Sequence, residues 1–258
     1  MDGKKTRVEG NLSVNAWVSE TDFRLARDSM RVGAVRRPAK SYPDNNLLKQ
    51  QQSRIMADPQ AIRAKFGMDY VASERTFTMG IDKRFAAKMA ERFRNRRVLE
   101  TCTGGGFTTI ELARVAEHVF SVEIDLAHQT QAKQNLETAG LSDRVTFVLG
   151  DILLEDTWGG LWGIDAAFLD PDWAVTGPDH VHRFRQSSMR PPADVLLDRV
   201  FRVTRNVALV LPPTLDMHEL AGLPRNERQR LYMDGNQELY CFYFGDLATS
   251  FGETEFRV

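Results

Sequence analysis

Short apolar segments alternate with helical patterns between residues 97 and 213, and this alternation restricts the possible folds more than any other feature. The strand-like segments are 97–101, 119–125, 144–151, 163–170 and 206–213, followed by a late apolar segment at 238–247. Helical patterns separate them at 107–116, 127–140 and 193–204. Near-continuous apolar strands that alternate with helices predict an α/β fold with a doubly wound, mostly parallel sheet.

Two further helical patterns precede the first strand. One begins at Asp58 and Pro59, a capping residue followed by a proline at the first helical position. The other covers 80–93, with an apolar residue at every fourth position. We therefore predict a domain over 56–258 that opens with a helical subdomain over 56–95.

The remaining residues, 1–55, are polar and rich in helix-breaking residues, which predicts a partly disordered arm. Charge is unevenly distributed between the N-terminal part of the chain, which includes this arm, and the rest. Residues 1–97 hold 21 Lys and Arg against 11 Asp and Glu, which leaves 13 against 24 for residues 98–258. A basic arm is typical of RNA binding, and attraction between the two halves of the chain is the alternative.

Several classes of protein are not indicated. No window approaches the roughly 20 apolar residues that a membrane helix needs, and the first residues lack a secretory signal. Two cysteines provide neither a disulfide framework nor a zinc site, and His180 and His182 have no ligand partner at a suitable spacing. We expect a cytoplasmic protein without membrane or metal; its oligomeric state is left open.

Three consecutive glycines, Gly104 to Gly106, follow the first strand in the stretch RVLETCTGGGFTTIELA. Ligands bind at such a position in a doubly wound sheet, beyond the carboxyl ends of the strands. The next strand ends at Glu123, an acid that can accept both ribose hydroxyls of an adenosine. This combination occurs in nicotinamide enzymes and in methyltransferases, so it leaves both classes open.

Acids at other strand ends favour S-adenosylmethionine. Glu100 ends the first strand, where a carboxylate suits the amino group of this cofactor and would repel a pyrophosphate. Asp151 follows the third strand, within reach of an adenine amino group. The fourth strand ends in DPDW, Asp170 to Trp173, where an amino-group methyltransferase would hold its acceptor.

The chain from about Asp58 to Leu247 resembles the methyltransferase domain of trimethylguanosine synthase, the RNA cap guanine-N2 methyltransferase family. The matching stretches include TCTGGGFTTIELA, FLDPDW, NVALVLPP and YFGDL. The resemblance implies a seven-stranded, Rossmann-like methyltransferase sheet with N-terminal helices. It also implies an S-adenosylmethionine-dependent enzyme that methylates guanine N2 in cap-type or other structured RNA.

The same resemblance implies a set of site residues. Phe77 and Thr78 would flank the methionine end of the cofactor, Glu100 and the glycine loop would hold its amino acid moiety, Glu123 its ribose and Asp151 its adenine. The expected cofactor-binding residues are thus Phe77, Thr78, Glu100, Thr103, Gly104, Gly106, Glu123, Asp151 and Asp170. The family has a serine, two prolines and a tryptophan at the acceptor loop, where this chain has Asp170, Pro171, Asp172 and Trp173.

Chemistry at this loop follows from the weakness of an aromatic amine as a nucleophile. The Asp170 carboxylate and the Pro171 carbonyl can accept the amine protons and turn its lone pair toward the methyl group. Trp173 offers a stacking face for the base, so we expect Asp170, Pro171 and Trp173 to be catalytic. Asp172, Arg183 and Arg185 are expected to bind substrate, the arginines through RNA phosphate or, alternatively, as a solvated basic segment.

Other functions stay open at this point. A methyltransferase for a small molecule or a protein would have the same cofactor motifs. A catalytically degenerate RNA-binding module of the same fold is supported by Asp172 in place of a proline and opposed by the retained Glu100, Glu123 and Trp173. A nicotinamide oxidoreductase would need a hydride-transfer residue that the sequence does not indicate.

Overall fold

The computed structural model describes residues 55–173 and 180–258, so the predicted arm of residues 1–55 lies almost entirely outside the described residues. The described part begins with short helices: α3 (Pro59–Phe66), α4 (Glu74–Met79), α5 (Lys83–Ala90) and the 3-10 turn η1 (Glu91–Phe93). Asp58 caps α3 by accepting a hydrogen bond from the Ala61 N–H, and Gly67 ends it in a left-handed conformation. Both follow the usual chemistry of helix ends.

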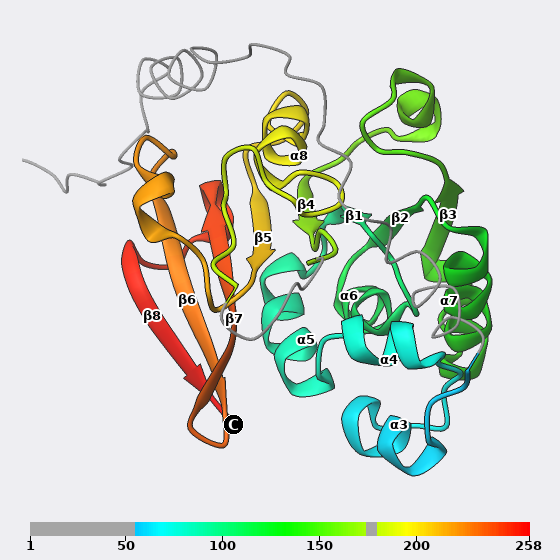
Figure 1. Cartoon of the computed structure of the whole chain (residues 1–258). Coiled ribbons are helices and arrows are strands. Elements are labelled where there is room, and N and C mark those ends of the chain that lie inside the picture. The colour runs from blue at the N-terminus through cyan, green and yellow to red at the C-terminus, as the bar shows by residue number, and fades with distance from the viewer. Residues whose placement is uncertain (1–54, 174–179) are drawn as a thin grey trace, which may run out of the picture. The chain divides into compact units, whose positions relative to one another are not determined.

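A mixed sheet of eight strands follows, in the order β3-β2-β1-β4-β5-β7-β6-β8 (Figure 1). Its parallel part comprises β1 (Arg97–Thr101), β2 (His118–Glu123), β3 (Val145–Leu149), β4 (Ala166–Leu169) and β5 (Val207–Leu211). The connecting helices are α6 (Phe107–Val115), α7 (Leu126–Ala139) and α8 (Ala193–Val200). This confirms the predicted doubly wound, mostly parallel sheet.

The chain winds in opposite directions from β1 and from β4, so these neighbouring strands form the switch point of the sheet. Right-handed crossovers then place α6 and α7 on one face and α8 on the other. Loops that follow β1 and β4 diverge at such a point and leave room for a ligand. The glycine loop follows β1 and the DPDW loop follows β4.

An antiparallel unit extends the sheet beyond β5. It contains β6 (Asn226–Met233), β7 (Asn236–Phe244) and β8 (Gly252–Arg257), and β7 pairs with both β5 and β6. The eighth strand exceeds the expected seven because β8 pairs in parallel with the outer side of β6. The other 3-10 turns are η2 (Ser142–Arg144), η3 (Glu155–Gly160), η4 (Met217–Leu220) and η5 (Gly245–Leu247).

A buried ion pair joins this antiparallel unit to the N-terminal helices. Glu227 on β6 is 1% exposed and accepts hydrogen bonds from Arg92 Nη1 at 2.7 Å and Nη2 at 2.9 Å. Its carboxylate also accepts from Thr249 and Thr254. Although burial opposes ionisation, the hydrogen bonds and the charge of Arg92 lower the pKa of Glu227 to about 2.

Among the described residues, no helix has the length and apolar character needed to cross a bilayer.

Candidate active site

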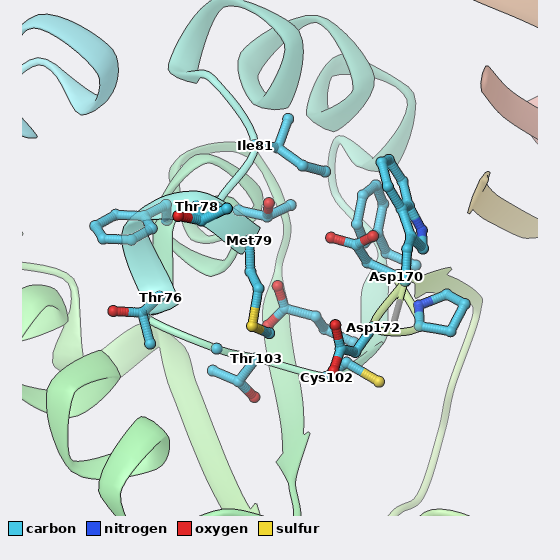
Figure 2. A pocket seen from close by; sticks show the side chains of 17 residues that line it. Thr76, Thr78, Met79, Ile81, Cys102, Thr103, Asp170 and Asp172 are labelled. Atoms are coloured by element: carbon cyan, nitrogen blue, oxygen red, sulfur yellow. The ribbon is translucent and has the colours of Figure 1, made fainter. Parts of the chain in front are cut away.

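A cavity of about 130 Å³, here called the inner cavity, lies where the loops after β1 and β4 diverge (Figure 2). Met79 and Ile81 lie on one side and Asp170 and Asp172 on the other, as Figure 2 shows. A second cavity of about 830 Å³, the outer cavity, is lined by Glu123 and other residues after β2 and by Asp151 after β3. The two cavities share Met79, Cys102 and Asp172 as lining residues.

Each glycine of the loop has a different reason to lack a side chain. Gly104 has a φ of +55°, and a Cβ there would have no atom within 4 Å, because this position opens into the inner cavity. A Cβ on Gly105 would meet the Phe107 ring at 2.6 Å. At Gly106, with a φ of +78°, it would lie 2.8 Å from the Cβ of Ala132 on α7. Of these three glycines, Gly104 and Gly105 line the inner cavity; Gly106, expected to bind cofactor, instead allows α6 and α7 to approach.

Glu100 is a buried carboxyl group in the inner cavity, 2% exposed at the end of β1. One of its oxygens, Oε2, accepts hydrogen bonds of 2.7 Å from Thr109 and from Ser121. Burial raises the pKa of Glu100 to about 7; these hydrogen bonds lower it, and the charge of Glu123 raises it further. A cationic group beside it would restore its ionised form.

Glu123 supports the glycine loop from the end of β2. Its carboxylate accepts three backbone hydrogen bonds of 2.9 Å, from the N–H groups of Gly104, Ile124 and Asp125. Each carboxylate oxygen has two lone pairs, so one site, on Oε2, remains for a hydroxyl donor from a ligand in the outer cavity. Glu123 can therefore shape the loop and bind a ribose at the same time.

Asp151 lines the outer cavity together with Glu123. Its Oδ1 accepts the Leu153 N–H at 2.9 Å, which fixes the side chain and leaves Oδ2 without a donor among the described residues. His128, on α7, also lines this cavity, and its buried Nε2 has no hydrogen-bond partner in the described part of the chain. Unpaired polar atoms beside a cavity large enough for a nucleoside are suited to a base with donors and acceptors.

The DPDW loop forms the other wall of the inner cavity, which Asp170, Pro171, Asp172 and Trp173 all line. Loss of solvation raises the pKa of Asp170 well above its usual range, and the charges of Glu100 and Asp172 act in the same direction. Trp173 packs against the hydrophobic core, and its buried Nε1 has no partner among the described residues. The inner cavity thus combines two carboxyl groups that favour a cation with an aromatic wall.

Asp172 forms hydrogen bonds with two other segments of the chain, through its side chain and through its backbone. Its carboxylate accepts a hydrogen bond of 2.6 Å from Arg75 Nη2 on α4. Its backbone N–H donates to the Arg190 carbonyl at 2.9 Å, and the Arg190 N–H returns a bond of 3.0 Å. The N–H that a proline would lack is therefore used, and the charge expected to attract the acceptor already has a partner.

Trp173 also lines a third cavity of about 470 Å³, here called the side cavity. Thr78, Met79, Gly80 and Ile81 line both this cavity and the inner one. The side cavity continues to Leu239 of β7 and to α5. The side cavity and the inner cavity are therefore neighbours, and Trp173 belongs to the lining of both.

Three other expected site residues lie elsewhere. Phe77 lines none of these three cavities, because its ring packs edge-on against Phe66 at 5.8 Å; its expected place at the inner cavity belongs to Thr76, Thr78 and Met79. Arg183 forms an ion pair with Glu219 at 2.5 Å. Arg185 donates to the carbonyls of Glu219 and Ala221. Both arginines hold the η4 turn rather than line the cavities.

Sequence reasoning did not identify Arg75, Met79 or Cys102 as site residues. Cys102 has a φ of +64°, an unusual conformation for a non-glycine residue that turns the chain into the glycine loop. Burial, followed by the charges of Glu123 and Asp170, raises the pKa of the Cys102 thiol well above its usual range, which disfavours the nucleophilic thiolate. No sequence motif signals Arg75, since its partner lies 97 positions away.

Comparison with known proteins gives a family and a fold. A family model described as RNA cap guanine-N2 methyltransferase matches residues 95–246. The catechol O-methyltransferase of Mycobacterium tuberculosis is 37% identical over 120 residues, which is 45% of this chain and 54% of that protein. A putative methyltransferase from Porphyromonas gingivalis is 15% identical with a TM-score of 0.59, over 90% of this chain and 59% of that one. The chain thus spans little more than half the length of either relative.

Proposed function

This chain belongs to the RNA cap guanine-N2 methyltransferase family, and on that basis we propose that it methylates the exocyclic N2 amine of a guanine in RNA. Family membership makes it a methyltransferase that uses S-adenosylmethionine, as the sequence predicts. The identity of the acceptor and the residue assignments below are proposals. They rest on the chemistry of the inner, outer and side cavities.

The two carboxyl groups in the inner cavity carry the assignment of the cofactor residues. Glu100 and Asp170 both have raised pKa values, so the cavity favours a ligand that brings positive charge. S-adenosylmethionine supplies, when bound, a cationic amino group and an electrophilic methyl group on a sulfonium. Glu100 would hold the amino group, Glu123 the ribose hydroxyls and Asp151 the adenine amine.

Acceptor chemistry would be performed by Asp170, Pro171 and Trp173. The Asp170 carboxylate, ionised beside a cationic cofactor, and the Pro171 carbonyl would accept the two N–H bonds of the amine. Trp173 would stack on the base, a contact worth about 1–3 kcal/mol. Its Nε1, which has no partner among residues 55–173 and 180–258, offers a donor to the ligand or to water. These residues position the amine for in-line displacement and require no strong base.

Binding of RNA would involve the basic residues before the sheet. Residues 1–97 carry 21 basic against 11 acidic side chains, and phosphate contacts of this kind weaken as salt is raised. Removal of residues 1–55 should therefore weaken binding of all RNA sequences and reduce the salt dependence of activity. Unchanged RNA affinity and salt dependence after this deletion would contradict a docking role for the arm.

The acceptor is tested by transfer of a labelled methyl group to capped RNA, uncapped RNA and catechol. We expect transfer to guanine N2 of RNA, sensitive to ribonuclease. Asp170→Asn and Trp173→Ala should lower kcat/KM by about 100-fold or more with RNA while S-adenosylhomocysteine still binds. Transfer to catechol alone would support a small-molecule enzyme, and cofactor binding without any transfer would support the degenerate RNA-binding module.

A further inference from the structure

We propose that Arg75 and Asp172 are positioning residues, which hold the acceptor loop Asp170–Trp173 against α4 across the bound cofactor. The inference rests on the use of S-adenosylmethionine, which family membership shows, and is independent of the proposed RNA acceptor. It assigns Asp172, the residue that departs from the family's proline, a role in retaining the cofactor rather than in attracting the acceptor.

The ion pair connects the two opposite walls of the inner cavity. Arg75 Nη2 lies 2.6 Å from Asp172 Oδ2, and the two side chains are only 17% and 16% exposed. Beyond Arg75, α4 supplies Thr76, Thr78 and Met79 to one wall. On either side of Asp172, Pro171 and Trp173 belong to the other wall. Parting of the pair would therefore let these walls separate.

The pair lies where the two cofactor cavities meet. Arg75 and Asp172 both line the outer cavity, and Asp172 also lines the inner cavity together with Met79 and Cys102. A ligand with its nucleoside in the outer cavity and its amino acid in the inner cavity must pass through this junction. It is therefore expected to be held beneath the connection between α4 and the acceptor loop.

The backbone of Asp172 does not need this ion pair for its own support. Two hydrogen bonds to Arg190 already fix it, so the carboxylate adds a connection to a different part of the chain. A proline at this position would lack both the N–H that bonds Arg190 and the carboxylate that bonds Arg75. The aspartate consequently links three segments: α4, the acceptor loop and the segment before α8.

Cofactor release gives the direct test. Dissociation of S-adenosylhomocysteine would be followed by stopped-flow displacement in the full chain and in Arg75→Gln and Asp172→Asn. We expect each substitution to accelerate dissociation at least about tenfold, equivalent to about 1.4 kcal/mol. The double variant should be no faster than either single variant, because both remove one interaction.

Arg199→Gln provides a matched control. Arg199 lies on α8, away from the cavities, and is also 17% exposed. The substitution removes its ion pair of 2.7 Å with Glu155. Dissociation should be unchanged in this variant. Arg75→Lys keeps the charge with a single ammonium and should lie between wild type and Arg75→Gln, so it provides a test even if a neutral variant fails to fold.

A purely structural role would lower the melting temperature without changing the dissociation rate. The inference is overturned if folded Arg75→Lys, Arg75→Gln and Asp172→Asn release the product at the wild-type rate. It is equally overturned if Arg199→Gln accelerates release as much as they do. Failure of the wild-type chain to bind S-adenosylhomocysteine would instead contradict the cofactor, whereas failure of RNA methylation would leave this inference standing.

Discussion

Replacement of Glu100 by glutamine should abolish a proton release that accompanies cofactor binding. In the ligand-free protein, burial raises the pKa of Glu100 to about 7, so much of the population carries a proton below neutral pH. An amino group placed beside the carboxylate favours the ionised form and lowers this pKa. Binding of S-adenosylhomocysteine, which has the same amino group as the cofactor, is therefore expected to expel the proton.

The size of the effect follows from the pKa of about 7. At pH 6, roughly 0.9 of the molecules are protonated at Glu100, so binding should release about 0.9 proton. Below neutral pH, affinity should then increase nearly tenfold, or about 1.4 kcal/mol, for each unit by which the pH rises. Above about pH 7 it should level off. Free α-amino groups titrate near 7.7–8.0, so the ligand remains cationic over the range that tests Glu100.

The same group affects the stability of the ligand-free protein with the opposite sign from an ordinary paired carboxylate. The folded state keeps its proton up to about pH 7, whereas the unfolded state loses it near the ordinary glutamate pKa of 4.5. Stability should therefore fall as the pH rises between these values, by about 3 kcal/mol in total. Glu100→Gln should remove this contribution, which urea unfolding across the pH range would measure.

Calorimetric titration at pH 6 in two buffers of different ionisation enthalpy counts the released protons. We expect about 0.9 in wild type and near zero in Glu100→Gln. Asp170→Asn provides the comparison, because Asp170 is the other inner-cavity carboxyl group with a raised pKa. Undiminished release in Glu100→Gln, together with its loss in Asp170→Asn, would refute the assignment to Glu100.

Three further predictions concern stability and the glycine loop. The lowered pKa of Glu227, about 2, contributes about 3 kcal/mol that is present above pH 4.5 and lost as the pH falls toward 2; Glu227→Gln should abolish this dependence in acid unfolding curves. Gly106→Ala should destabilise the fold by about 1–3 kcal/mol in urea, because its Cβ would lie 3.0 Å from the Cα of Ala132. Gly104→Ala should lower the melting temperature less than Gly106→Ala does. It should weaken S-adenosylhomocysteine binding about tenfold or more in calorimetry, since the methyl group would occupy the cavity. Unchanged affinity would show that no ligand approaches this backbone.

Four strands of the central sheet, β1, β2, β4 and β5, could be predicted because they are buried on both faces and carry near-continuous apolar sequences. The outermost strands, β6 and β8, could not. β6 buries alternate residues, but two of these are Glu227 and Gln229, whose polar side chains are 1% and 5% exposed. The sequence of β6 therefore shows no apolar alternation. The buried carboxylate of Glu227 is stabilised instead by a salt bridge from Arg92. β8 is an edge strand with Glu253 and Glu255 outward, and it gives a similarly weak signal.

The site was predictable where a residue type and its position at a strand end carried the information. Glu100, Glu123 and Asp151 lie at the cavities for this reason, since strand ends of a parallel sheet meet at one edge. Roles that depend on contacts between distant segments were not predictable. Gly106 looks like a ligand-binding glycine until Ala132 is found behind it, and Asp172 looks like a free charge until Arg75 is found beside it.

At the proposed cofactor site, we expect the junction between the inner and outer cavities to determine which alkyl donors are accepted. Of the three residues shared by the two cavities, Met79 has the longest and most flexible side chain. Cys102 has an unusual backbone conformation, and the Asp172 side chain is fixed by its ion pair with Arg75. Met79→Ala should therefore create space beside the transferred group with the least disturbance. Such a variant would be a starting point for an orthogonal enzyme that accepts allyl or propargyl analogues of the cofactor and tags its own substrates in a mixture.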